Sequence, residues 1–272
     1  MDITISKMEE IGIEELKKLQ LDILINVRDF CDAKGIMYYL AYGTLLGAVR
    51  HKGYIPWDDD IDIMMPREDY NRFLKEFNGY YKDLEVLAPE LDLNYYAPYA
   101  NVVDKRTLLV EQSLNHKDIG VKIDIFPIEN IPDDEVKYQR ICKESESLNR
   151  MRSSKVACLS FYKGSEWLKL AIKKFLYSLK SFSKIQKRII DLAKKSNFGD
   201  DRFVDCIVFI TIKNRKFPRT CIQGFELMDF ENQKFKIPKD YDKCLKALFG
   251  NYMQLPPVEK RVMRHNFKAY WK

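Results

Sequence analysis

The sequence predicts an α+β fold in which a mixed sheet is flanked by helices and followed by a helical insertion. Short apolar segments alternate with amphipathic helical segments through residues 1–130, and the apolar fraction of 46% is enough for a large core. The chain then changes to lysine-rich helical patterns. We therefore expect a first domain at 1–130, a mainly helical subdomain at 131–235, and a segment at 236–272 that returns to the core.

The first predicted elements are a helix and a buried strand. Apolar residues recur at helical spacing from Ile13 to Lys34, and Gly35 suits the position just after a helix end. Residues 36–42 (IMYYLAY) are short, aromatic and bounded by glycines, which indicates a strand. A turn, a short helix and a loop are expected in GTLLGAVRHKGYIPW at 43–57.

The next elements complete the expected sheet. A second strand is predicted at 60–65, ending at Pro66, and a helix follows at 68–77. Strand-like segments lie within 84–110, and an apolar strand interrupted by one aspartate is predicted at 121–128 (VKIDIFPI).

The middle of the chain is dominated by lysine-rich helix near 167–195. Five apolar residues form one stripe, with lysines largely between them: Leu168, Ile172, Phe175, Leu179 and Phe182. We expect a helical subdomain that buries this stripe, and the alternative is a face for a membrane surface. Near the end, Asp240 and Gly250 bound a helix, and a last helix is expected after Pro256-Pro257.

Composition excludes several classes of protein. A charge of +6, from 46 basic and 40 acidic residues, is too small for a histone-like binder. The six cysteines are scattered with no C-x-x-C pair, which favours free thiols over a zinc site or disulfide scaffold. No apolar run approaches the roughly 18 residues of a transmembrane helix. We expect a cytoplasmic protein, with peripheral contact at the cytoplasmic membrane face left open.

The segment IPWDDDIDIMM at 55–65 places four carboxylates within five positions and then becomes apolar. In a strand, Asp58, Asp60 and Asp62 would share one face while Ile61 and Ile63 enter the core. Two carboxylates about 6 Å apart repel by roughly 2–3 kcal/mol at an effective dielectric near 20. A divalent cation is the simplest compensation, and hard carboxylate ligands suit Mg²⁺ completed by substrate phosphates.

The acidic segment could also have a role that involves no magnesium. A solvated acidic turn is disfavoured by the adjacent apolar residues, and a calcium-binding EF-hand loop fails because it needs glycine where Ile63 stands and glutamate where Asp69 stands. A structural ion pair is the third possibility, with Arg50, Lys52 or Arg67 as partner.

Upstream of the acidic segment, Gly43 and Thr44 lie between the predicted strand and helix. Backbone N–H groups and a hydroxyl at such a turn can receive an anion. A phosphate at this position would lie close to a cation held by the acidic segment.

The stretch YGTLLGAVRHKGYIPWDDDIDI at 42–63 resembles the signature of the LicD family of phosphocholine transferases, which includes fukutin-type ribitol-phosphate transferases. KIDIFPIE at 122–129 and FGNYMQLPP at 249–257 extend the resemblance. It covers residues 36–130 and 236–265 and implies a nucleotidyltransferase-like fold. The zinc site of the fukutin-related branch has no evident counterpart, which favours the bacterial branch.

The resemblance also implies roles for individual residues. It assigns Gly43 and Thr44 to the phosphate turn, and Asp60, Asp62 and Asp124 to the metal. We add Arg50 as a donor-binding residue. Asp124 is the expected catalytic base, and Asp58 is the alternate. A helix after Pro256-Pro257 would put Arg261 and His265 on one face, either over the diphosphate or as part of a solvated basic surface.

The expected reaction is Mg²⁺-dependent transfer of phosphocholine from CDP-choline to a hydroxyl of a glycan or lipid-linked glycan acceptor, with release of CMP. The acceptor would be a lipopolysaccharide, teichoic acid or capsule precursor. Candidate aromatic contacts for choline are Trp57 and the Tyr95-Tyr96 pair. The alternatives are a CDP-glycerol or CDP-ribitol dependent polyol-phosphate transferase, an RNA nucleotidyltransferase or basic-patch RNA binder, and a scaffold without activity. No nucleic-acid partner is expected, since no RNA-binding motif is present.

Overall fold

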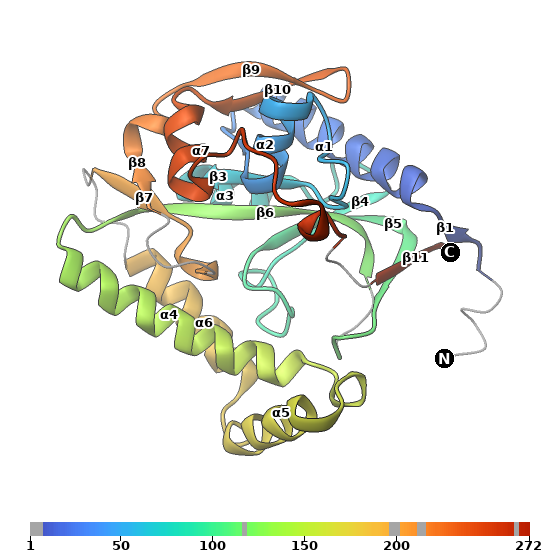
Figure 1. Cartoon of the computed structure of the whole chain (residues 1–272), viewed down its shortest axis with the longest axis vertical. Helices are drawn as coiled ribbons and strands as arrows, with labels where there is room; N and C mark the ends of the chain where they lie inside the picture. Colours follow the sequence, from blue (N-terminus) through green and yellow to red (C-terminus); the bar gives the residue numbers. More distant parts are fainter. Residues whose placement is uncertain (1–7, 116–118, 196–201, 211–215, 264–266) are drawn as a thin grey trace.

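The computed structural model describes residues 8–115, 119–195, 202–210, 216–263 and 267–272. Figure 1 shows the expected α+β architecture, built around one large sheet. Its main path follows the order β1 (Glu10–Ile11), β11 (Phe267–Trp271), β5 (Ala100–Glu111), β6 (Ile119–Ile131), β3 (Asp62–Pro66) and β2 (Tyr39–Leu40). Strand β4 (Leu84–Leu87) pairs with β5, and β7 (Phe203–Asp205) pairs with β6 and β8 (Phe217–Pro218). Because β3 and β6 run parallel and the other pairs antiparallel, the predicted mixed sheet is confirmed.

Both faces of the central strands are buried. On β3, Ile63 and Met65 enter one core, whereas Met64 enters the other. The first core includes residues of α1 (Ile13–Lys34), α2 (Tyr42–His51), α3 (Arg67–Glu76) and the hairpin of β9 (Phe225–Phe230) and β10 (Gln233–Pro238). The second includes residues of α4 (Glu135–Val156) and α6 (Phe182–Lys195), which Figure 1 shows below the sheet. Burial on two faces explains why the strands read as almost continuous apolar runs.

The predicted helix boundaries hold closely where capping residues mark them. Helix α1 spans the expected residues, and Gly35 adopts the left-handed conformation at its end. Helix α7 (Tyr241–Phe249) lies between Asp240 and Gly250 as expected. The strand expected at 36–42 is shorter than predicted, because only Tyr39–Leu40 pairs with β3 and α2 has begun by Tyr42.

Within the described residues, the α-helices in the middle of the chain lie in its first part. Helices α4, α5 (Gly164–Leu176) and α6 occupy most of 135–195, but the chain then contributes β7, β8 and β9. The expected boundary at 235/236 falls inside β10, and β7 pairs with β6. The division into three domains stays a prediction. In the described part of the chain, every helix is too short or too polar to cross a bilayer.

The helix predicted after Pro256-Pro257 is wrong. The chain makes one 3-10 turn at Val258–Lys260 and later forms β11, which pairs with β5 and β1. Pairing satisfies the backbone groups at this side of the sheet, and that gain outweighs the local helical pattern. The closing segment therefore returns to the core as a strand.

Candidate active site

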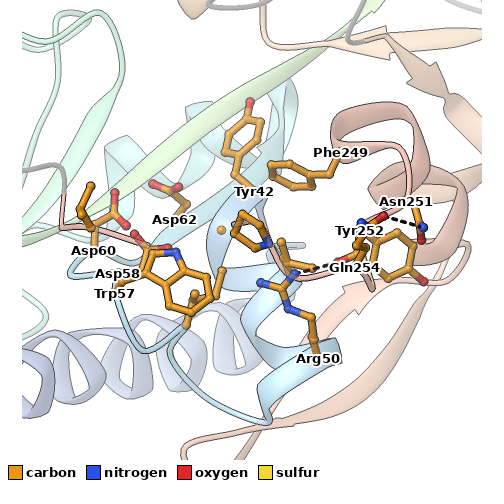
Figure 2. A pocket seen from close by; sticks show the side chains of 15 residues that line it. Tyr42, Arg50, Trp57, Asp58, Asp60, Asp62, Phe249, Asn251, Tyr252 and Gln254 are labelled. Carbon is orange, nitrogen blue, oxygen red and sulfur yellow. Dashed lines mark hydrogen bonds between the residues drawn. The ribbon is translucent and has the colours of Figure 1, made fainter. Parts of the chain in front are cut away.

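A cavity of about 470 Å³ opens beside the acidic segment. It lies between the first turn of α2, the loop that leads into β3, and the chain after α7. Figure 2 shows the carboxylates of Asp58, Asp60 and Asp62 on one wall, with Arg50 and Tyr252 on the opposite side. Negative and positive groups therefore face the same space.

The acidic segment is organised differently from the strand that was predicted. Strand β3 begins only at Asp62, so residues 58–61 form a loop in which alternation does not apply. One carboxylate oxygen from each of Asp58, Asp59 and Asp60 lies within 4.8 Å of the other two. Asp59, which alternation had placed on the other face, is buried and belongs to this cluster. This burial shows that the segment is not a solvated turn.

Asp62 and Asp124 are neighbours on parallel strands. They are paired in the register of β3 and β6, on the face that farther along contains Met64 and Phe126. Burial raises the pKa of Asp62 well above its usual range, and the carboxylates of Asp60, Asp124 and Asp58 raise it further. The ionised carboxylates of this site therefore repel one another, and a bound cation can relieve that repulsion.

Two polar partners hold the buried Asp124 side chain. Both the Asn101 amide and the Lys122 ammonium donate to its Oδ1, the latter at 2.5 Å. Neither of these bonds uses Oδ2, which therefore remains for a ligand or a proton. Sequence reasoning missed both partners. Both could have been identified as polar residues inside apolar strands, Asn101 in YANVVD and Lys122 in VKIDIFPI.

Gln20 supports the acidic loop from α1. Its amide donates to the backbone oxygens of Asp59 and Lys122, at 3.0 Å and 3.4 Å. The side chain is buried in the otherwise apolar face of α1. A glutamine on the apolar face of a predicted helix could have indicated this role, because buried polar groups require hydrogen-bond partners.

The oxygen atoms that these residues offer as ligands fit a hard divalent cation. Carboxylate oxygens of Asp58, Asp59 and Asp60 lie together on the loop, and Asp62 at the start of β3 is paired with Asp124 in the middle of β6. Oxygen ligands of this kind suit Mg²⁺. The calcium-loop alternative is not supported, because Ile63 is buried in the core rather than in a loop. Among the basic residues that could pair with the acidic segment, Arg67 instead binds Glu129 and Glu90.

Lys122→Met is expected to separate the lysine's structural effect from its effect on metal binding. Loss of the ammonium leaves Asp124 beside Asp62 without a cation, so the metal-free protein should lose about 1–3 kcal/mol of unfolding free energy. Added Mg²⁺ should then raise the Tm more than in the wild type, because it no longer competes with the ammonium. Thermal denaturation with and without Mg²⁺ measures both effects.

The exposed Lys105→Met variant is the control for removal of a lysine from the same sheet. It should respond to Mg²⁺ as the wild type does. An identical Mg²⁺ response in the Lys122 variant would contradict the competition.

Gly43 and Thr44 lie in the first turn of α2, beside the acidic loop. The Asp58 carboxylate packs so closely on Gly43 that an added Cβ would lie 2.7 Å from its Oδ2. An anion at this turn would therefore require Asp58 to turn toward a metal. The Thr44 hydroxyl is buried and accepts the backbone N–H of Asp62 at 2.8 Å. This hydrogen bond holds the backbone of Asp62 in place, and phosphate binding by Thr44 stays a prediction.

Arg50 and Arg261 lie near the cavity. Arg50 lines it and donates from Nη1 to the backbone oxygen of Tyr252 at 2.8 Å. Burial lowers the pKa of Arg50, and the Arg261 guanidinium lowers it further, so bound phosphate would relieve this repulsion. Arg261 lies over the ring of Trp57, 5.5 Å from the centroid, and not on a helix. His265 lies outside the described residues.

Aromatic side chains form much of the remaining cavity wall. Tyr42, Trp57, Phe249 and Tyr252 line it, as Figure 2 shows. Trp57 was among the predicted choline contacts, whereas Tyr95 and Tyr96 are not among the described residues that line this cavity. Tyr95 instead donates to Asn101, so it supports Asp124 indirectly.

Known proteins are similar to this chain, one of them over almost its whole length. The family profile described as the LicD/FKTN/FKRP nucleotidyltransferase domain matches residues 35–157. The lipopolysaccharide cholinephosphotransferase LicD of Haemophilus influenzae is 28% identical over 270 residues, covering 97% of this chain and 99% of that protein. Human ribitol 5-phosphate transferase FKRP is 50% identical over 38 residues, which are 14% of this chain and 8% of FKRP.

Proposed function

We propose, from the match of residues 35–157 to the LicD/FKTN/FKRP nucleotidyltransferase domain, that the chain transfers phosphocholine from CDP-choline to a glycan hydroxyl. The observation that carries the proposal is the cavity itself. It brings the carboxylates of the acidic loop and β3 together with Arg50 and an aromatic wall. A phosphorylated alcohol with a cationic head needs all three kinds of contact.

The chain's own residues provide positioning and proton transfer. Bound Mg²⁺, held by Asp60, Asp62 and Asp124, would neutralise charge on the diphosphate. Asp124 is fixed through Oδ1 by Asn101 and Lys122, so its Oδ2 can take the proton of the attacking hydroxyl. Asp58 is the alternate base. Arg50 would bind phosphate oxygens, with Arg261 close by.

The aromatic wall suits the trimethylammonium head of choline. A quaternary ammonium is attracted to the faces of aromatic rings, most strongly to tryptophan. Since the Arg261 guanidinium already lies over Trp57, the rings of Tyr42, Phe249 and Tyr252 offer further contacts. These rings and the nearby carboxylates would favour a cationic alcohol over glycerol or ribitol.

The acceptor is proposed to be a lipopolysaccharide precursor, as the name of the full-length Haemophilus relative indicates. Teichoic acid and capsule precursors share the same chemistry, a sugar hydroxyl on a carrier. All six cysteines are free, which suits a reducing compartment, and we place the reaction at the cytoplasmic side of the membrane.

The donor is tested by thermal denaturation with CDP-choline, CDP-glycerol and CDP-ribitol, each with and without Mg²⁺. We expect CDP-choline with Mg²⁺ to give the largest Tm increase, because only this ligand fills the aromatic and acidic walls together. CMP release with a glycan acceptor then reports turnover. A larger response to CDP-ribitol would select the polyol-phosphate alternative, and salt-sensitive RNA binding without CDP-choline turnover would overturn the assignment.

Gly43→Ala is expected to lower kcat/KM by about a hundredfold while the fold persists. The new methyl group would displace the Asp58 carboxylate and block close approach of phosphate to the backbone of this turn. Because the nearest atom is the end of a side chain, the Tm should change little. CMP release and thermal denaturation measure the two effects.

Gly47→Ala on the same helix is the matched control. Its Cβ would lie 2.5 Å from the backbone oxygen of Gly53, so this variant should lose stability. If Gly43→Ala retained full kcat/KM, the phosphate turn would lie elsewhere.

A further inference from the structure

Helix α5 directs its apolar residues to solvent. Among its residues, all of which the structure describes, Leu170 alone is buried. Leu168, Ile172 and Leu176 are exposed at intervals of four positions, and Phe175 lies three positions after Ile172, so these residues share one face. The exposed Trp167 borders that face. Phe175 is 79% exposed, and Leu179 just after the helix is 98% exposed. The expectation that this stripe is buried within the subdomain is therefore wrong for α5.

The helix lies at the margin of the molecule. Figure 1 shows α5 at the lower edge, beyond α4 and α6 and away from the large sheet. Its packing partners include α4 and the 3-10 turn at Leu159–Phe161. The neighbouring α6 differs, because its Ile185, Ile189 and Ile190 face the core. The outward apolar face belongs to α5 and not to every lysine-rich helix.

Basic residues are concentrated along and beside α5. From Lys163 to Arg188 the sequence has eight basic residues and one acidic residue, Glu166. Glu166 pairs with Lys169 at 2.7 Å on the helix surface. The segment therefore combines exposed apolar side chains with a strong excess of cations, a combination typical of helices that lie in a membrane interface.

A cavity of about 360 Å³ lies between α4, α6 and the turn that follows α5. Apolar and cationic side chains form its wall: Leu148, Met151, Leu179, Lys180, Lys184 and Arg188. The Lys180 ammonium contacts the sulfur of Met151 at 3.3 Å, and Arg188 pairs with Glu144 at 2.9 Å. An anionic headgroup can lie between these cations while the apolar wall contacts its chains.

We propose that the outward face of α5, with this cavity, docks the protein on an anionic phospholipid bilayer. The apolar side chains enter the interface, Trp167 lies at headgroup depth, and the surrounding lysines bind anionic headgroups. A second copy of the chain is a poorer partner, because a symmetric dimer would oppose two strongly cationic surfaces. Docking is independent of the proposed function, since vesicle binding needs neither donor nor acceptor.

Co-sedimentation with vesicles tests the docking surface. We expect binding to phosphatidylcholine vesicles that contain phosphatidylglycerol, weaker binding at high salt, and little binding to phosphatidylcholine alone. The tryptophan emission should shift to shorter wavelength with anionic vesicles, and Trp167→Phe should remove most of that shift. Equal binding to neutral vesicles would overturn the proposal.

Surface variants locate the contact. Phe175→Ser combined with Leu179→Ser should weaken vesicle binding about tenfold or more. Lys180→Glu combined with Lys184→Glu should weaken it by at least about fivefold for each lysine. The controls are Leu227→Ser, an exposed apolar residue on β9, and the exposed Lys75→Glu on α3. Equal effects of the controls, or a dimer in sedimentation velocity that Phe175→Ser dissociates, would overturn the proposal.

Discussion

Replacing Asp62 by Asn is expected to abolish phosphocholine transfer, with kcat/KM lowered about a thousandfold or more. Asp60→Asn should do the same. Each change removes a carboxylate oxygen from the proposed metal site and leaves an amide of nearly equal size. The folded structure should persist, because both variants also relieve repulsion among Asp58, Asp60, Asp62 and Asp124. CMP release and thermal denaturation are the two measurements.

The pH dependence of stability provides an independent readout for Asp62. Because its pKa is raised in the folded state, the folded protein retains this proton when the unfolded chain has lost it. The metal-free wild type should therefore lose stability as the pH rises from the ordinary value of 3.8 through the raised pKa. Asp62→Asn lacks this loss, so its Tm should exceed that of the wild type increasingly across the same interval.

Asp229→Asn, an exposed carboxylate on the β9–β10 hairpin, is the matched control for removal of one aspartate. It should retain wild-type turnover and the wild-type pH profile. Near-normal turnover of Asp60→Asn or Asp62→Asn, with Mg²⁺ as the sole metal supplied, would show that these residues do not bind the metal.

Glu129→Gln is expected to cost about 3–5 kcal/mol of unfolding free energy. Glu129 is fully enclosed and pairs with Arg67, which also donates to Glu90 at 3.0 Å. The second Glu129 oxygen accepts the backbone N–H of Ile207 at 3.1 Å. An amide leaves the buried guanidinium partly uncompensated and weakens the connection between α3, β6 and the chain after β7. Urea denaturation measures the loss.

Glu76→Gln tests whether burial is the reason for that cost. Glu76 pairs with Arg72 on the surface of α3 at 3.6 Å, and both side chains are exposed. Exposed pairs of this kind contribute at most about 1 kcal/mol. If Glu129→Gln destabilised the protein no more than Glu76→Gln does, the buried ion pair would not stabilise the fold.

The Arg67 network also shows where sequence reasoning stops. Arg67 follows the acidic segment closely in sequence, which makes it a candidate partner for those carboxylates. In the structure its partners lie 23 and 62 positions away, on the chain before β5 and at the end of β6. Closeness of two charged residues in sequence does not decide whether they pair. Arg67 pairs instead with a carboxylate that is buried beside it in the fold.

The family resemblance assigned Asp124 to the acidic segment. The sequence by itself determined the helices marked by glycine and capping residues, the α+β class, and the position of the acidic segment. These follow from local rules, because capping and periodicity act over a few residues. The tertiary structure alone decided that Asp59 joins Asp58 and Asp60, that Asn101 and Lys122 hold Asp124, and that β11 replaces a predicted helix. It also decided that α5 faces outward, because periodicity identifies an apolar face but only packing determines what covers it.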